Sequence, residues 1–453
     1  PFERGKIYDR NGNILATNEK IYTLILEPQN ILLQDKKYEE ATINALHEYF
    51  GFSKNKLKKT IEDNPYSYYE VYKKNMTYDE VEKFQKFLDL ADASAKGVSK
   101  AKKAKIESAK MVKGVSFEED YKRVYPYNSL ACRVLGYTSS GNVGNWGIEQ
   151  YYNSQLNGVN GRAYYYFNEE LDQEQSVKEP KNGNSVVSTI DMQIQKIIEQ
   201  KLKDFDDKIG SKVTNILVMN PQNGEIYAMV NVPEYDLNDP FSLSAKKRKA
   251  NSKKQQEYLN KKWRNSCLND TYEPGSVFKI VTATAGLESS KVSVNDHFNC
   301  PGFRIVEDRK IRSHKVGGHG SETFKEGVMN SCNPVFMDVG ARVGVDGMYQ
   351  TFRQLGLFEK TGIDLPGEAS SIMHQKKNVG AVELATMSFG QSIQITPLQL
   401  LRAVSAVING GKLITPHFGR YVQKQDGTRL KAFFYSVKEG VIKKQTSETM
   451  KEL

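Results

Sequence analysis

The chain has 453 residues, of which 39% are hydrophobic and 26% are charged. These proportions exclude an intrinsically disordered chain, and the length is sufficient for two or three domains with a sizeable core. Lysine and arginine total 64 against 54 aspartate and glutamate residues, a net charge of +10. That charge suits nucleic acid, a membrane surface or an acidic polymer and does not choose among them.

The ends of the chain and its cysteines limit the class of protein further. No run of about 18 apolar residues occurs, so we expect no membrane-spanning segment here. The chain opens at Pro1 with neither a methionine nor a signal-like apolar stretch, and we expect its own start to lie upstream. Four cysteines lie far apart, with no Cys-x-x-Cys pair and no Cys/His cluster at metal spacing. They predict neither a disulfide scaffold nor a metal site.

Residues 1–183 are predicted to form the first domain. Apolar strands flank Asn11-Gly12, a dipeptide typical of a type I′ hairpin turn. The lysine-rich stretch 95–110 is predicted to be a solvated surface helix. The Pro/Gly/Asn-rich stretch 179–184 is typical of a linker. We therefore place a domain boundary near residue 183.

Residues 184–453 are predicted to form a mixed α+β domain. Asp191 can cap a helix on which apolar residues recur at helical spacing; these are Ile194, Ile197, Ile198, Leu202 and Phe205. Two strands follow around the turn at 221–224, and a long helical region comes after them. A second basic run, 246–262, is predicted to be a solvated loop or helix, with contact to an anionic wall polymer as the lesser alternative.

The segment TYEPGSVFKIVTATAGLE carries the first chemical signal. Pro274-Gly275 leads into a helical pattern whose apolar positions can face a core; they are Val277, Phe278, Ile280, Val281, Ala285 and Leu287. Ser276 then lies in the first turn, with Lys279 on the same helix face. A serine hydroxyl needs a base, and a partly buried lysine of lowered pKa can serve as one. The free N–H groups of the helix N-terminus can stabilise an oxyanion.

Spacing alone does not single out this pair. Ser-x-x-Lys also occurs at Ser53/Lys56, Ser99/Lys102 and Ser244/Lys247, in lysine-rich surroundings where chance explains it. Only Ser276 stands between a Pro-Gly entry and an apolar helix.

A second signal follows in TFKEGVMNSCNPVFMDVG. Thr323 and Glu326 predict a capping box for a short helix. That helix leads to Ser331 and Asn333 in a turn before the next apolar helix, where a second wall of a cleft can form. Ser331 can relay a proton, and Asn333 can bond a substrate amide and the lysine; an ordinary helix-connecting turn is the alternative.

Together, YEPGSVFK, SCN, RGKIYDRNG and KTGIDLPGE…GQSIQITPLQL resemble a class B penicillin-binding protein. The resemblance runs from residue 4 to the end. It implies an N-terminal pedestal (dimerisation) domain and a penicillin-binding transpeptidase domain with an antiparallel sheet flanked by helices. It also implies that Ser276 is the acylated nucleophile, that Lys279 is its base, and that Ser331 and Asn333 form the second motif.

The tripeptide Lys360-Thr361-Gly362 resembles the third catalytic motif of that family, but its position argues against this role. It falls in a short connection before the Pro366-Gly367 turn, whereas the catalytic triplet must lie on a strand beside the nucleophile. In the family, KTGIDLPGE is a structural element at this place. No later Lys-Thr-Gly or Lys-Ser-Gly occurs, so we expect the chain to stop before the true third motif and this fragment to acylate poorly.

Weaker signals complete the sequence. No Cys, Asp or Glu completes a plausible metal-binding set with His314 and His319 at close spacing, which favours a loop over a metal site. Thr396 is predicted to cap a helix of the core, Asp426-Gly427 to form a hairpin turn, and Ser447 to cap a helix near the end.

The resemblance implies a peptidoglycan D,D-transpeptidase that uses no metal or organic cofactor and is inhibited by β-lactams. It further implies a membrane helix before Pro1, a location at the extracytoplasmic face of the bacterial membrane, and division, elongation or sporulation partners bound by the N-terminal domain. A role in nucleic-acid binding has only the net charge in its favour. Two alternatives remain open: a β-lactamase or D,D-carboxypeptidase that transfers the acyl group to water, and a catalytically incomplete scaffold for wall synthesis.

Overall fold

The structure, a computed structural model, describes residues 1–94, 96–167 and 173–453. The chain forms two compact units. The first comprises residues 1–4, 16–124 and 158–183, and the second comprises residues 5–15, 125–157 and 184–453.

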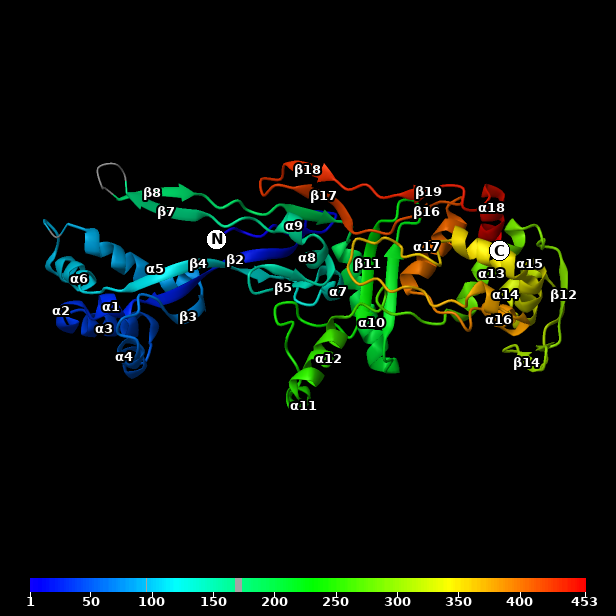
Figure 1. Cartoon of the computed structure of the whole chain (residues 1–453), viewed down its shortest axis with the longest axis horizontal. Coiled ribbons are helices and arrows are strands. Elements are labelled where there is room, and N and C mark those ends of the chain that lie inside the picture. Colours follow the sequence, from blue (N-terminus) through cyan, green and yellow to red (C-terminus); the bar gives the residue numbers. More distant parts are fainter. Residues whose placement is uncertain (95, 168–172) are drawn as a thin grey trace. The chain divides into compact units, whose positions relative to one another are not determined.

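An antiparallel sheet organises the first unit (Figure 1). Strand β2 (Ile14–Leu26) pairs with β3 (Glu70–Met76) and, on its other edge, with β4 (Val115–Val124). Their apolar face packs against helices into a core that includes Leu24, Leu46 and Phe84. The other elements of this unit are α1 (Pro28–Ile31), α2 (Leu33–Lys36), α3 (Glu39–Phe50), α4 (Lys54–Asp63), α5 (Tyr78–Leu88), η1 (Asp89–Asp92), α6 (Lys100–Lys110), β7 (Arg162–Phe167) and β8 (Gln173–Lys178).

The predicted basic helix is confirmed as α6 in this unit. Its side chains are mostly exposed, and only Ile106 and Ala109 are buried. The start of the predicted segment, residue 95, lies outside the described residues.

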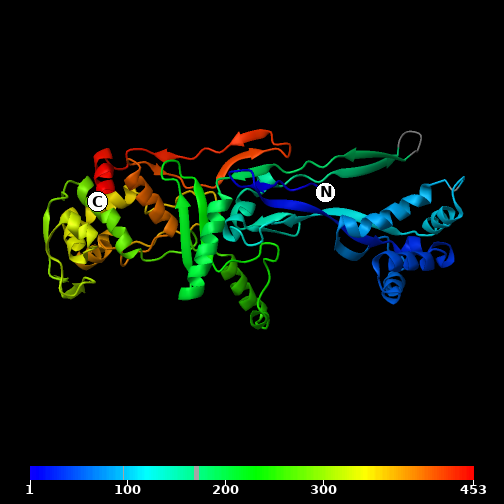
Figure 2. The same cartoon turned by 180° about the vertical axis from the view of Figure 1, so that it is seen from behind.

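A mixed sheet begins the second unit. Strand β1 (Ile7–Tyr8) pairs in parallel with β9 (Ser185–Ser188), and β17 (Gly419–Gln423) pairs antiparallel with both β9 and β18 (Arg429–Ala432). Helix α10 (Met192–Ile209) packs on the hairpin of β10 (Thr214–Met219) and β11 (Ile226–Val232), as Figures 1 and 2 show from opposite sides. Asp191 accepts hydrogen bonds from the backbone N–H groups of Gln193 and Ile194, so the predicted helix cap is confirmed.

A helical core forms the rest of the second unit and positions the candidate site. Helices α13 (Lys279–Glu288), α15 (Asn333–Gln354), α17 (Pro397–Ile408) and α18 (Lys444–Glu452) share one apolar cluster that contains Phe278, Phe336 and Phe352. Thr396 caps α17 as predicted. The remaining elements of this unit are α7 (Cys132–Leu135), β5 (Tyr137–Ser139), β6 (Val143–Asn145), α8 (Gly147–Tyr151), α9 (Asn153–Leu156), α11 (Ala245–Arg248), α12 (Ser252–Trp263), η2 (Gly275–Phe278), β12 (His297–Cys300), β13 (Phe303–Val306), β14 (Arg309–Arg312), β15 (Gly320–Thr323), α14 (Phe324–Met329), η3 (Lys376–Asn378), α16 (Ala381–Met387), β16 (Leu413–Ile414) and β19 (Val437–Lys438).

Two details of the predicted turns and caps are wrong. The chain reverses at Asn11-Gly12, but only Gly12 has a positive φ (89°), so the turn is not type I′, which needs positive φ at both residues. Ser447 does not cap a helix, because α18 begins before it and its buried hydroxyl accepts from the N–H of Gly410. Lys443 is the N-cap residue of that helix, and its N–H donates to the carboxylate of Glu288 in α13.

The helical spacing of apolar residues also predicted more buried positions than the structure has. Ile197 and Phe205 of α10 are exposed, and so is Val277 beside the candidate serine. A helix buries only the stripe that faces its neighbours, and Ile198 and Leu202 form the stripe of α10 that faces the hairpin of β10 and β11. In the described part of the chain, no helix combines the length and apolar character needed to cross a bilayer.

Candidate active site

The Pro-Gly entry sets the position of Ser276. Gly275 has a φ of 58°, which residues with a side chain rarely adopt, and its N–H donates to the carbonyl of Gly390 at 2.9 Å. The short helix η2 follows, and α13 continues it from Lys279. Phe278, completely buried, anchors the turn in the core and leaves Ser276 at the surface of a cavity.

Lys279 joins the two predicted motifs. Its Nζ lies 3.2 Å from the Oγ of Ser276, 3.0 Å from the Oγ of Ser331 and 2.7 Å from the Oδ1 of Asn333. It also donates to the carbonyl of Ser331 at 2.7 Å. The structure therefore brings all four predicted residues together, although Ser331 and Asn333 come from the turn between α14 and α15 and the start of α15.

The second motif is held by the elements predicted for it. Thr323 and Glu326 form the expected capping box of α14, and Asn333 is the first residue of α15. Ser331 between them has a φ of 46°, which turns its hydroxyl and its carbonyl toward the same amine. The other side of the Asn333 amide donates to the carbonyl of Arg312 at 3.1 Å, which fixes its orientation.

Burial changes the acidity of the lysine. Lys279 is 4% exposed, and this burial lowers the pKa of its ammonium group from 10.5 to about 8, an effect that negative charge on Cys332 would oppose. The ring of Phe336 lies 5.4 Å from the Nζ and helps to exclude water. A free amine at neutral pH is what a general base requires.

A cavity of about 270 Å³ opens onto this group. Ser276, Lys279 and Ser331 form its polar wall, and apolar side chains form the rest; these are Ile280, Ala283, Val328, Phe336, Val404, Val407, Ile408, Met450 and Leu453. A hydroxyl that faces a cavity beside a buried amine is accessible to an electrophile.

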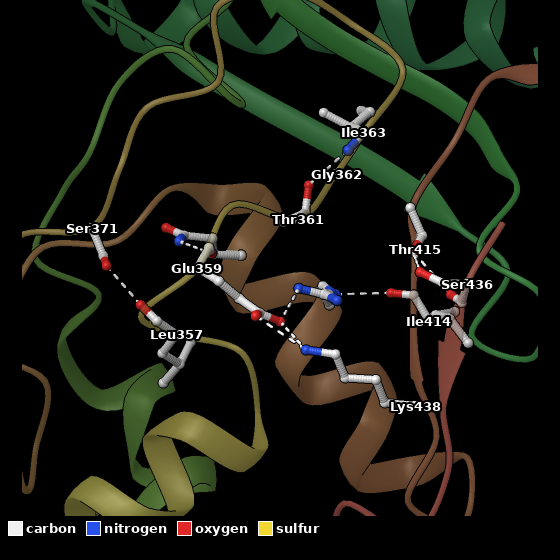
Figure 3. Close-up of polar contacts among 12 residues, drawn as sticks. Leu357, Glu359, Thr361, Gly362, Ile363, Ser371, Ile414, Thr415, Ser436 and Lys438 are labelled. Carbon is white, nitrogen blue, oxygen red and sulfur yellow. Dashed lines mark hydrogen bonds and ion pairs between the residues drawn. The ribbon is translucent and has the colours of Figure 1, made fainter.

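Lys360-Thr361-Gly362 lines a different cavity from the one at this site. The tripeptide lies in a loop rather than on a strand, and the carboxylate of Glu368 accepts from the N–H groups of Thr361 (2.7 Å) and Gly362 (3.3 Å). Figure 3 shows the Thr361 hydroxyl bonded within its own loop, to the N–H of Ile363. The tripeptide lines a separate cavity that none of the four site residues borders. The predicted structural role of this segment agrees with these contacts.

The chance matches have ordinary structural roles. Ser53 and Ser99 are helix caps whose hydroxyls accept from the backbone N–H of Lys56 and Lys102. Ser244 precedes the short helix α11.

Sequence reasoning missed Gly390 as part of this site. Its φ is 80°, and a Cβ there would lie 2.1 Å from the carbonyl oxygen of Gly275. Any side chain at Gly390 would therefore displace the turn that carries Ser276. The positive φ could not be foreseen, because the Phe-Gly-Gln-Ser sequence has no specific turn signature.

Two protein families match this chain. The family described as "Penicillin-binding Protein dimerisation domain" matches residues 1–188, and "Penicillin binding protein transpeptidase domain" matches residues 214–453, more than half of the chain. The chain belongs to the class B penicillin-binding proteins. The resemblance inferred from the motifs is confirmed, and so is the two-domain α+β fold.

Individual relatives agree with this assignment. "Stage V sporulation protein D" of Bacillus subtilis is 33% identical over 461 residues, covering 100% of this chain and 65% of the relative. "Probable peptidoglycan D,D-transpeptidase PenA" of Neisseria meningitidis is 25% identical, covering 95% of this chain and 67% of the relative. The chain spans about two thirds of the length of such curated relatives, or slightly less.

Solved structures share the fold of this penicillin-binding protein. Penicillin Binding Protein 2X from Streptococcus thermophilus has a TM-score of 0.78 at 22% identity and covers 100% of this chain and 65% of that chain. PBP2 from Helicobacter pylori, solved in complex with MreC, has a TM-score of 0.72 at 26% identity and covers 99% of this chain and 81% of that chain.

Proposed function

We propose that the protein is a peptidoglycan D,D-transpeptidase that acts through a serine acyl-enzyme. The Oγ of Ser276 attacks the carbonyl of the penultimate D-Ala of a stem peptide while Lys279 takes its proton. Terminal D-Ala leaves as the C–N bond breaks and receives a proton. An amine from a neighbouring stem then attacks the ester carbonyl, and Lys279 transfers the proton of that amine to the Oγ of Ser276. The bond from the carbonyl to Ser276 breaks, and the new amide closes the cross-link.

The position of the Lys279 amine is the observation that carries this proposal. It contacts the hydroxyl of Ser276 and both polar residues of the second motif within one buried group. Ser331 can pass a proton between the amine and the leaving group, and Asn333 can hold the amide of the substrate. The names of the relatives support the same chemistry, since several are called peptidoglycan D,D-transpeptidases.

The nucleophile can be tested by the intact mass of the full-length protein after incubation with penicillin. The wild type should gain the mass of one penicillin, and Ser276→Ala should gain none, because this variant lacks the hydroxyl proposed to attack the lactam carbonyl. Ser53→Ala, which removes the serine of a chance Ser-x-x-Lys match, is the matched control and should be acylated normally. An adduct that persists in Ser276→Ala would refute the assignment.

The lifetime of that adduct separates the transpeptidase from its rivals. A β-lactam should mimic the donor peptide and remain bound to Ser276 for many minutes. Turnover within seconds would instead favour a β-lactamase or carboxypeptidase. No adduct in the full-length wild type would favour a scaffold for wall synthesis.

The rate of acylation should rise with pH and level off above about 8. The neutral amine is the active base, and a pKa of about 8 leaves roughly a tenth of Lys279 neutral at pH 7, against well under a thousandth at the ordinary pKa. Below pH 8 the rate should therefore fall by about tenfold per pH unit. Stopped-flow acylation by a chromogenic cephalosporin between pH 6 and 9 measures this profile, and a flat profile would rule out Lys279 as the base.

The rest of the protein fits the same proposal. We assign residues 1–183 to a pedestal that binds division, elongation or sporulation partners and residues 184–453 to the transpeptidase domain. A location at the extracytoplasmic face of the bacterial membrane follows from this role, because peptidoglycan is assembled there. Every catalytic step above uses only protein groups and the substrate, without a cofactor.

A further inference from the structure

Four potential metal ligands lie close together at the second motif, and one of them is part of that motif. Cys300 ends β12, His319 precedes β15, Glu322 lies within β15, and Cys332 lies between Ser331 and Asn333. One ligand atom from each of the four lies within 4.8 Å of all the others. Spacing along the sequence did not reveal this group, because β12 and β15 pair antiparallel and bring together residues far apart in the chain.

The distances suit one small ion. The Nδ1 of His319 lies 3.6 Å from the Sγ of Cys300 and 3.9 Å from the Oε1 of Glu322. Ligands of a tetrahedral zinc ion lie about 3.2–3.8 Å from one another, given zinc–ligand distances of about 2.0–2.3 Å. The sulfurs of Cys300 and Cys332 are 2.7 Å apart, so binding requires them to separate by about 1 Å.

The four residues bury polar atoms that a bound cation would stabilise. Both cysteines are completely buried, and Glu322 is 3% exposed. The Oε2 of Glu322 accepts from the Asn330 amide at 2.9 Å, whereas its Oε1, the atom in the cluster, has no hydrogen-bond partner among the described residues. An unpartnered buried carboxylate oxygen is costly, and coordination to a cation would offset that cost.

Backbone contacts hold two of the four potential ligands, His319 and Cys300, next to each other. The N–H of His319 donates to the carbonyl of Cys300 at 3.0 Å. Gly318 has a φ of 73°, and a Cβ there would lie 2.0 Å from that same carbonyl oxygen. Only glycine permits this close approach, which holds His319 beside Cys300.

We propose that Cys300, His319, Glu322 and Cys332 bind one zinc ion, which holds the turn of Ser331 and Asn333 against Lys279. Two thiolates, an imidazole and a carboxylate are ligands that zinc prefers among common biological cations. Four protein ligands in a buried group leave no open position, so the ion is structural and Cys332 is a positioning residue. Binding releases the two thiol protons to solvent.

Metal content of the full-length protein tests the site directly. Protein produced in zinc-supplemented medium and purified without a metal-affinity step should contain about one zinc per chain by plasma mass spectrometry. Cys332→Ser and His319→Ala should each lose most of it, whereas Cys132→Ala, which removes a buried cysteine of the same unit, should keep it. Cobalt exchanged into the wild type should show a thiolate-to-metal absorption band, which does not depend on the folding of any variant.

Three results would overturn the proposal. Wild type with less than about 0.1 zinc per chain and four titratable thiols would mean that no ion binds. A mass about 2 Da lower, with two thiols missing, would show a Cys300–Cys332 disulfide instead. Zinc retained by both ligand variants would place the ion elsewhere.

The proposal that zinc positions the turn of Ser331 and Asn333 rests on the proposed function, and the rate of acylation tests it separately. Removing zinc with a chelator should slow acylation of Ser276 by about 10–100-fold, and added zinc should restore the rate. An unchanged rate would refute positioning while leaving the metal site intact. Zinc content does not depend on the identity of the nucleophile, so failure of either proposal is distinguishable from failure of the other.

Discussion

Replacing Lys279 by methionine should slow the acylation of Ser276 by penicillin by about 10²–10⁴-fold. General bases contribute about 10²–10⁴-fold, and this amine is the base nearest to the hydroxyl, at 3.2 Å. Methionine is unbranched and fills the buried space in which the lysine is 4% exposed, so the packing around Phe336 should be kept. Stopped-flow acylation of the full-length protein measures the effect.

Lys56→Met supplies a matched control for this prediction. Lys56 has the same spacing from Ser53 as Lys279 has from Ser276, but Ser53 only caps α4. This variant should be acylated at the wild-type rate. A Lys279→Met protein that folds normally and is acylated within tenfold of wild type would show that another group takes the proton.

Replacing Asp364 by alanine should destabilise the second unit by at least about 3 kcal/mol. Its carboxylate is 1% exposed and accepts from the N–H groups of Phe418 (2.8 Å) and Gly419 (2.6 Å) and from the hydroxyl of Tyr152. Each hydrogen bond to a charged group contributes about 1.5–3 kcal/mol, and alanine would leave these donors buried without an acceptor. Thermal unfolding followed by circular dichroism should show a midpoint lower by about 5 °C or more.

A variant of the nearby Lys360 tests whether the same segment has a catalytic role as well as a structural one. Lys360 is exposed, and if Lys360-Thr361-Gly362 is not a catalytic wall, Lys360→Ala should change neither the unfolding midpoint nor the rate of acylation. Loss of acylation in Lys360→Ala would mean that the tripeptide does contact substrate. An unfolding midpoint of Asp364→Ala equal to that of wild type would show that other acceptors replace the carboxylate.

Local signals in the sequence were sufficient to predict several helix caps and to select the candidate site residues. Asp191, Thr323 and Thr396 each cap the helix predicted for them, because a cap depends on a few adjacent residues. Ser276 and Lys279 were found because one helical turn places them together whatever the rest of the chain does.

Predictions were wrong or incomplete where exposure, capping or membership of the site depends on contact with a distant part of the chain. Ile197 is exposed and Ser447 is not a cap, because exposure and capping there depend on elements that no periodicity describes. Gly390 belongs to the site through one backbone contact with Gly275, from a distant part of the chain.

The amino-acid sequence by itself determined which hydroxyl, which amine and which amide are proposed to take part in the chemistry, since that choice follows from residue type and motif context. Only the tertiary structure decided how that chemistry is tuned and supported. Burial of Lys279 among distant helices lowers its pKa, and the pairing of β12 with β15 brings Cys300 and His319 to Cys332. Desolvation and long-range contacts depend on how the whole chain packs, and no local pattern of residues contains that information.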